Sequence, residues 1–172
     1  MSRRGSTTRA DEWIRALDLV PHPEGGLYRE TYRAKEILAA SALPRRYAGR
    51  RPFSTAIYFL LRSGEVSRLH RLRSDEVWHF YDGNPLCLHV FSPKGRYSSP
   101  VLGWRPGRGE RFQYVVPRGA WFGAEVIGSD SFSLIGCTIA PGFKFADFEL
   151  GEKSELIKRF PRRRCLIERL TV

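Results

Sequence analysis

The sequence has few cysteines and no long apolar run, and each lack excludes a class of protein. The three cysteines, Cys87, Cys137 and Cys165, are an odd number without Cys-x-x-Cys spacing. This argues against zinc fingers or a disulfide scaffold and is typical of a reducing compartment. No stretch approaches the roughly 18 apolar residues of a membrane span, and the basic N-terminal segment is not followed by the apolar core of a signal peptide. We therefore expect a cytoplasmic protein that does not enter the membrane.

Acidic residues are also scarce relative to basic ones. Lys and Arg number 29 against 18 Asp and Glu, a formal net charge of +11. Such a balance is the usual footprint of nucleic-acid binding. Here, however, the basic residues are spread along the chain, cluster only at 45–46, 50–51 and 162–164, and are not interleaved with aromatic residues. A solvated face or a site for a small anion explains the charge at least as well, so we do not expect a nucleic-acid partner.

The length and the punctuation of the chain predict one β-rich domain. The 172 residues, 42% of them hydrophobic, suffice for one packed core, and we expect a single domain over 1–172 with 1–7 flexible. Thr8, followed by Asp11, indicates a helix start, and Trp13, Ile14 and Leu17 continue at helical spacing to about residue 19. Short apolar runs separated by Gly, Pro, Asn or Asp then predict antiparallel strands at 28–33, 55–61, 66–71, 76–81, 86–91, 101–104, 111–116, 121–126 and 132–139. Short helices are expected at 36–42 and 154–160, and an edge strand at 166–172.

The segment 64–83 concentrates the candidate chemistry. The residue pattern of this segment predicts two strands joined by a polar turn at 73–75. The segment contains His70, Glu76 and His79 within ten residues. Imidazole and carboxylate groups are the pair that proteins use for divalent metals and for proton transfer near neutral pH. Because alternate residues of a strand share a face, Glu76 should point to the opposite side from His79. His70 with Glu76 is therefore the better pair, and His79 joins it only if a bulge intervenes.

The spacing of Gly64, His70, Glu76 and Gly83 resembles the first conserved motif of the cupin superfamily. In metal-binding cupins, a second His follows the first by two residues and a third lies in a later Pro-x-Gly motif. Here Leu72 holds the first of those positions, and Phe122, after Pro117-Arg118-Gly119, holds the second. The resemblance thus implies a site that has lost two of its four usual ligands.

A closer resemblance covers roughly residues 13–160. The sequence HPEGGLYRETYR at 22–33, the segments 74–81 and 116–122, and Ala140-Pro141-Gly142-Phe143 together resemble the DUF985 (Cupin_5) family of uncharacterised cupins. This implies an all-β double-stranded β-helix, a jelly-roll barrel, with a short N-terminal helix and a minor C-terminal helix. It also implies a homodimer in which 28–33 pairs or exchanges, and a fold similar to that of the RmlC-type sugar-nucleotide epimerases.

Several residues are therefore candidates for a site inside the barrel, although each could instead be a satisfied core, turn or interface residue. The catalytic candidates are His70, Glu76, His79 and Tyr28, with His70 and Glu76 also the candidate metal ligands. The ligand-binding candidates are His22, Arg29, Glu30, Trp78, Phe80, Trp121 and Arg118.

Three functions fit these residues. The first is a metal-independent epimerase or isomerase acting on a small polar metabolite, anionic or sugar-like, with a His as base, a Tyr as acid and an Arg holding the anionic group. The second is a non-catalytic module that binds such a metabolite. The third is a metal-dependent isomerase or oxygenase with a reduced ligand set. We expect no required cofactor, and a divalent metal only in the third case.

Overall fold

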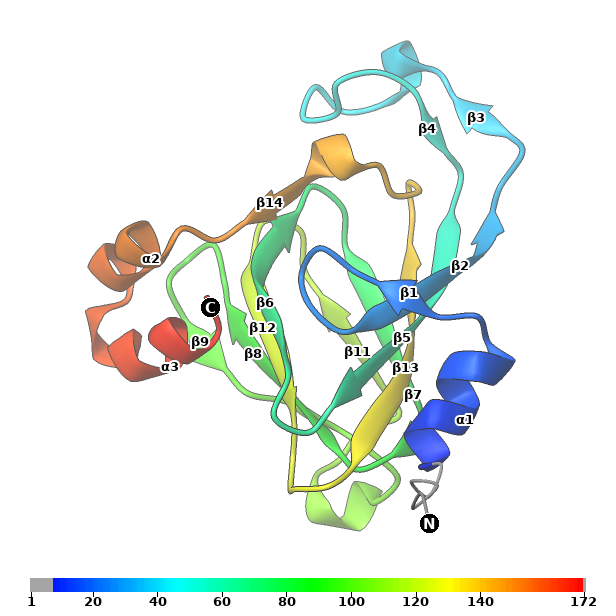
Figure 1. The fold of residues 1–172 in the computed structure, drawn as a ribbon. Coiled ribbons are helices and arrows are strands. Elements are labelled where there is room, and N and C mark those ends of the chain that lie inside the picture. The colour runs from blue at the N-terminus through cyan, green and yellow to red at the C-terminus, as the bar shows by residue number, and fades with distance from the viewer. Residues whose placement is uncertain (1–7, 172) are drawn as a thin grey trace.

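The alternating strands of the sequence form two facing antiparallel sheets (Figure 1). The structure, a computed structural model, describes residues 8–171, so the segment 1–7 predicted to be flexible lies outside the described residues. The first sheet runs, in spatial order, β1 (Val20–Pro21), β2 (Leu27–Arg33), β5 (Thr55–Arg62), β13 (Phe132–Ile139), β7 (Glu76–Gly83) and β11 (Gln113–Val116).

The second sheet takes the strands that lie between these in the sequence. Its order is β10 (Val101–Leu102), β8 (Leu86–Phe91), β12 (Trp121–Val126), β6 (Val66–Leu72) and β14 (Phe148–Leu150), with β9 (Tyr97–Ser98) beside β8. From β5 to β8 and from β11 to β14, consecutive strands alternate between the two sheets. This is the predicted jelly roll, built as two sheets that are not hydrogen-bonded into one closed ring. A separate pair, β3 (Ile37–Leu38) and β4 (Arg51–Pro52), forms an arm beyond the sheets (Figure 1).

The inward side chains of both sheets form the main core. Residues from β7 and β13 of one sheet, among them Trp78 and Ile135, pack with Leu88 and Phe122 of the other, and all four are at most 1% exposed. Along β7 the predicted alternation is confirmed, because Glu76, Trp78 and Phe80 are buried while Tyr81 is exposed. The strand periodicity thus decides which side chains reach the space between the sheets.

The helices cover the outer faces. Helix α1 (Arg9–Ala16) begins with the predicted capping box, in which the Thr8 hydroxyl accepts the Asp11 N–H at 3.2 Å, and it lies against the first sheet (Figure 1). Helices α2 (Lys153–Arg159) and α3 (Arg164–Arg169) cover the second sheet near β8 and β9. Four short 3₁₀ turns complete the elements: η1 (Ala40–Ala42), η2 (Pro106–Arg108), η3 (Phe145–Asp147) and η4 (Pro161–Arg163).

Two sequence-based expectations about these elements are wrong. The edge strand expected at 166–172 is instead α3, because Ile167 and Leu170 fall on one helical face and are buried against Leu69 and Phe91 of the second sheet. The helix expected at 36–42 is a strand followed by the single 3₁₀ turn η1. No helix within residues 8–171 is both long and apolar enough to cross a membrane.

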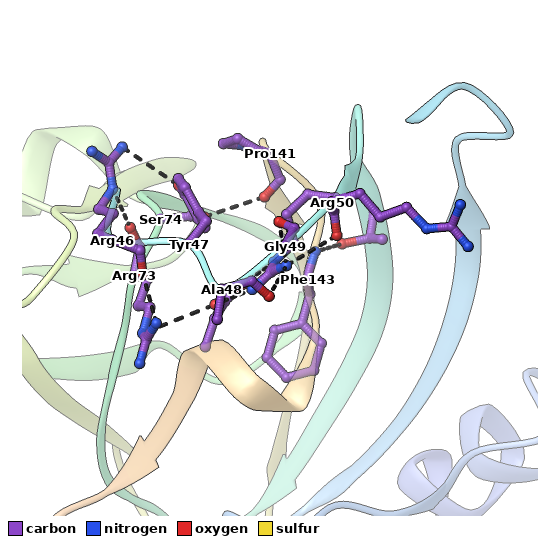
Figure 2. A network of polar contacts seen from close by, with 12 residues as sticks. Arg46, Tyr47, Ala48, Gly49, Arg50, Arg73, Ser74, Pro141 and Phe143 are labelled. Atoms are coloured by element: carbon purple, nitrogen blue, oxygen red, sulfur yellow. Dashed lines mark hydrogen bonds and ion pairs between the residues drawn. The ribbon is translucent and has the colours of Figure 1, made fainter. Parts of the chain in front are cut away.

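A buried ion pair holds the arm to the sheets. The Arg51 guanidinium donates two hydrogen bonds to the Asp147 carboxylate, at 2.6 and 2.7 Å, and both side chains are at least 95% buried. Beside it, the Tyr47 hydroxyl lies 2.9 Å from the Ser74 hydroxyl, which donates to the Pro141 carbonyl (Figure 2). The arm is therefore attached through polar contacts rather than through the apolar core.

Breaking this ion pair should cost far more than breaking an exposed one nearby. Asp147→Asn leaves the Arg51 charge buried without a counter-ion, so we expect the free energy of unfolding to fall by about 3–5 kcal/mol. The matched control is Glu149→Gln, because Glu149 pairs with Arg71 at 2.8 Å but is 55% exposed. Its loss should be at most about 1 kcal/mol. Urea denaturation measures both, and equal losses would contradict the prediction.

Candidate functional site

A cavity of about 650 Å³ opens between the two sheets. Its inner end is polar and buried, with His70 2%, Glu24 6% and Glu76 6% exposed. Its outer end is formed by exposed residues of β2 and of the segment that leads into β14. The lining residues are His22, Glu24, Tyr28, Glu30, Arg33, Thr55, Ile57, His70, Leu72, Glu76, Cys137, Ile139, Phe143, Lys144, Phe145, Ala146 and Phe148. The volume lies within the range of small-molecule sites.

The turn between β1 and β2 inserts Glu24 into this cavity. The turn is closed by the His22 N–H donating to the Gly26 carbonyl at 3.1 Å and by the Gly25 N–H donating to the His22 carbonyl at 3.0 Å. Gly25 has φ +104°, and a Cβ there would collide with the carbonyl oxygen of Val66 on β6. Only glycine permits so close an approach. The turn therefore packs on β6 and presents Glu24 to the side chains of that strand.

Glu24 and His70 form a buried acid–base pair. The Nδ1 of His70 lies 2.7 Å from the Arg68 carbonyl oxygen, which can only accept, so Nδ1 carries a hydrogen. The other ring nitrogen, Nε2, lies 3.2 Å from Glu24 Oε2. A buried acid and a buried base therefore lie side by side. Burial lowers the pKa of His70 and raises the pKa of Glu24, and both effects favour a neutral pair over an ion pair.

His22 faces the same carboxyl group. Its Nδ1 accepts the Glu24 backbone N–H at 3.3 Å and lies 3.5 Å from Glu24 Oε2. The hydrogen of a neutral His22 is therefore on Nε2, for which no acceptor exists among the described residues. Burial lowers the pKa of this imidazole, which keeps it neutral. The remaining oxygen, Glu24 Oε1, accepts the Ser67 hydroxyl at 2.9 Å, so each oxygen of the buried carboxyl has a polar neighbour.

Glu76 is the second carboxyl of the inner end. Its Oε2 accepts the indole N–H of Trp78 at 2.8 Å, while Oε1 has no hydrogen bond to the nitrogen or oxygen atoms of the described residues. Burial is the largest cause that raises the pKa of Glu76 from its ordinary 4.5 to about 7. The Cys137 thiol lies beside it, and burial raises the pKa of that thiol well above its ordinary value. Glu76 can therefore both accept and donate a proton near neutral pH.

The outer end combines aromatic rings with two cationic side chains. The rings of Phe143 and Phe145 are 5.0 Å apart and those of Phe145 and Phe148 are 6.2 Å apart, while Lys144 and Arg33 lie beside them. Arg33 makes two hydrogen bonds to Glu30, at 2.8 and 2.6 Å. The Lys144 ammonium has no acidic partner within residues 8–171. The ring faces can stack on a flat ligand and the ammonium can hold an anionic group.

The structure brings together five of the residues that the sequence nominates and places the other six elsewhere. The cavity is lined by His22, Tyr28, Glu30, His70 and Glu76. Outside it lie His79, Arg29, Trp78, Phe80, Trp121 and Arg118. The parity of the strands explains most of this division, because the side chain of His79 contacts Gln113 at 2.9 Å on the other face of β7, and Arg29 alternates with Tyr28 and Glu30. Trp78 does not line the cavity, but its indole N–H donates a hydrogen bond to the Glu76 carboxyl group.

Sequence reasoning missed Glu24 and the outer cations Arg33 and Lys144. Glu24 stands between Pro23 and Gly25, where the local pattern predicts only a turn. The signal was present in the HPEGG sequence, which contains an acidic residue next to the nominated His22. Lys144 lies in an irregular segment that has no periodicity to orient it.

The donor set does not fit the four-ligand metal site of cupins. Leu72 and Phe122 occupy two of the ligand positions, and the ring centroid of Phe122 is 4.1 Å from that of His70. The free nitrogen of His70 faces Glu24. Within residues 8–171, no three His, Cys, Asp or Glu side chains are grouped so that they could hold a metal ion.

Two facing sheets with alternating strands, around a cavity with a His and a Glu at these positions, define a cupin. The chain belongs to the Cupin_5 family of the cupin superfamily (DUF985), whose family model matches residues 11–151.

The chain is similar to proteins from several organisms. The crystal structure of protein SO0799 from Shewanella oneidensis is 39% identical, with a TM-score of 0.86 over 96% of this chain and 98% of that one. A hypothetical protein from Leishmania major is 37% identical, with a TM-score of 0.86 over 95% and 99% of the two chains. The uncharacterised protein YML079W of Saccharomyces cerevisiae is 28% identical over 143 residues, 78% of this chain and 71% of that protein. Oxalate decarboxylase of Bacillus subtilis, 15% identical with a TM-score of 0.53, shares the fold alone.

Glu76 makes stability depend on pH in a defined direction. Because the pKa of this carboxyl is raised from 4.5 to about 7 on folding, its contribution to stability is complete below pH 4.5 and is lost as the pH rises through 7. Glu76→Gln removes this loss while its amide oxygen can still accept the Trp78 N–H. The stability of the variant relative to the wild type should therefore rise, by on the order of 3 kcal/mol, between about pH 4 and about pH 8.

Urea denaturation at a series of pH values measures this difference. The lowered pKa values of His22 and His70 give the opposite slope below pH 6.5, and both groups are present in both proteins. The charge of Glu76 raises the pKa of His70, so the variant lowers that pKa further, which adds to the rise of its relative stability with pH. A difference that stays constant with pH would contradict the assignment.

Proposed function

We propose that this protein binds a small, polar, carbohydrate-like metabolite with an anionic group in the cavity and epimerises or isomerises it without a metal. The observation that supports this most directly is the cluster of Glu24, His70 and Glu76, titratable groups that are buried together at the inner end of the cavity. Proton transfer to and from carbon requires such groups in a site from which water is largely excluded. The aromatic outer end and Lys144 fit a ring with a negative charge.

The proposed reaction balances without an oxidant or reductant. A carbon next to a carbonyl group loses its proton to the carboxylate of Glu76, and the electrons of the broken C–H bond move into an enolate. A proton is then returned to the same carbon from the other face, or to the neighbouring one. Tyr28, on β2 and in edge contact with the His22 ring at 4.6 Å, is the proposed acid. The proton that Glu76 gains and the proton that Tyr28 loses are exchanged with solvent, which restores both groups for the next turnover.

A non-catalytic binding module is the alternative. The observation that favours it is that both ring nitrogens of His70 already have partners, Arg68 and Glu24, which leaves neither free for a ligand. In that case the cavity binds the metabolite, and the carboxyls serve only affinity and specificity. That the protein forms a homodimer and that it is cytoplasmic remain predictions from the sequence.

Deuterium incorporation distinguishes an epimerase or isomerase from a non-catalytic binding module. Nucleotide sugars and related sugar phosphates are incubated with the protein in heavy water, and proton NMR follows the loss of signal at carbons next to a carbonyl group. We expect Glu76→Gln to reduce incorporation about 100-fold or more while binding is kept, and His70→Gln to act in the same direction. The matched control is His79→Gln, because His79 lies on the other face of β7, and its rate should stay within about twofold of the wild type. Binding without incorporation in the wild type would favour the module.

Elemental analysis tests the metal-dependent alternative. Untagged protein purified without chelators should contain metal well below one ion per chain, since Leu72 and Phe122 replace two ligands and two protein ligands hold a transition metal weakly. The controls are His70→Ala and Glu76→Ala. Metal near one ion per chain that disappears in both variants would contradict the proposal and favour a metal-dependent isomerase or oxygenase.

A further inference from the structure

A second hollow, of about 350 Å³, shares Leu72 with the cavity and is lined by arginines. The strand β14 and the turn before it separate the two spaces, because Ala146 and Phe148 line the cavity whereas Asp147 and Glu149 line the hollow. Four guanidinium groups, those of Arg46, Arg71, Arg73 and Arg118, surround it. We call this space the arginine hollow.

The charges of the arginine hollow do not balance. Glu149 is paired with Arg71 at 2.8 Å. The Asp147 carboxylate is occupied by the buried Arg51, and its distance from Arg73 is 4.0 Å. Four arginines and two carboxylates thus line the hollow, an excess of two positive charges. Arg46, Arg73 and Arg118 have no carboxylate at hydrogen-bonding distance from their guanidinium groups among the described residues.

Two of these three guanidinium groups are already held in place. Arg46 Nε donates to the Arg73 carbonyl at 3.0 Å, and Arg73 Nη1 donates to the Arg46 carbonyl at 2.6 Å, so each side chain is held by the backbone of the other residue (Figure 2). The Arg46 guanidinium also lies over the Tyr47 ring, 4.7 Å from its centre. Each guanidinium has five N–H donors, and these contacts use only one or two. Binding an anion here would therefore require little ordering of Arg46 and Arg73.

Arg118 completes the arrangement from a different part of the chain. It lies in the turn between β11 and β12, where its backbone N–H donates to Asp75 at 2.7 Å and the next N–H, of Gly119, donates to the Leu72 carbonyl at 2.8 Å. Its guanidinium has no acceptor among the described residues. The sequence nominated Arg118 as the holder of an anionic group, and its position assigns it to this hollow rather than to the cavity.

We propose that the arginine hollow binds a phosphate or diphosphate group of a small metabolite, at a site separate from the cavity. Planar guanidinium groups match phosphate oxygens with paired hydrogen bonds, and an excess of two positive charges favours a multiply charged anion. The hollow is at the small end of ligand sites, which begin at about 300 Å³, so it takes the anionic group while the rest of the ligand extends into solvent. The proposal does not depend on the function of the cavity, because Arg46, Arg73 and Arg118 do not line it.

Isothermal titration calorimetry with pyrophosphate at low salt tests this site. We expect Arg118→Ala to weaken binding about tenfold or more, because it removes a charged pair of donors, and added salt to weaken binding to the wild type. The matched control is Arg50→Ala. Arg50 is an exposed arginine on the arm that also contains Arg46. It does not line the hollow and extends away from the network in Figure 2, so its loss should change the affinity less than about twofold.

Backbone NMR of the wild type keeps the test independent of how the variants fold. On addition of pyrophosphate, the amides of Arg73 and Gly119 should shift, and those of His22 and His70 should not. Absence of binding, an equal loss in Arg50→Ala, or shifts spread over the whole surface would overturn the proposal in favour of a generally positive surface.

A third experiment uses phosphatidylcholine vesicles containing phosphatidylinositol phosphate. Vesicle binding that requires Arg118, without binding of pyrophosphate, would replace the small metabolite by a lipid headgroup.

Discussion

Burying a carboxylate between packed β-sheets costs free energy unless a hydrogen-bond donor or a proton accompanies it. Three buried carboxyl groups of this protein are stabilised in three different ways. Asp147 is neutralised by a guanidinium with two hydrogen bonds. Glu24 lies beside His70 and burial raises its pKa, while Glu76 has its pKa raised to about 7 and receives an indole hydrogen bond. The first arrangement is an ion pair that anchors the arm. The other two leave mobile protons in a cavity, which is the physical basis for proposing acid–base chemistry there.

The loss of two cupin ligand positions changes the partner of the remaining histidine. In this chain the ring of Phe122 packs on His70, and Leu72 lines the wall of the cavity. The polar partner of His70 comes instead from the turn between β1 and β2, outside the motif that identifies the superfamily. Glu24 can reach that position because Gly25 permits the turn to touch the backbone of β6. The chemistry of the site thus depends on a loop that packs against the sheet.

The strand β14 and the turn before it separate two environments of different character. On one side Phe145 and Phe148 line a cavity whose inner end contains the buried Glu24, His70 and Glu76. On the other side Asp147 and Glu149 border a hollow with excess positive charge. Alternation along β14 divides Phe148 from Glu149, and the 3₁₀ turn η3 directs Asp147 to the hollow and Phe145 and Ala146 to the cavity. Part of the net charge of +11 is thus concentrated at one hollow in three dimensions, although the basic residues are spread along the sequence.

The sequence by itself determined the strand pattern, the capping box of α1, the family and the position of His70 and Glu76 on the inner face, because each depends on residue spacing along one element or within one motif. It also nominated Tyr28 and Glu30 correctly as neighbours on β2. Only the tertiary structure decided that Glu24 faces His70, that Arg118 joins Arg46 and Arg73, and that 164–169 is a helix. Those outcomes depend on contacts between segments 40 or more residues apart, and local spacing has no information about which distant backbone a turn or a helix will pack against.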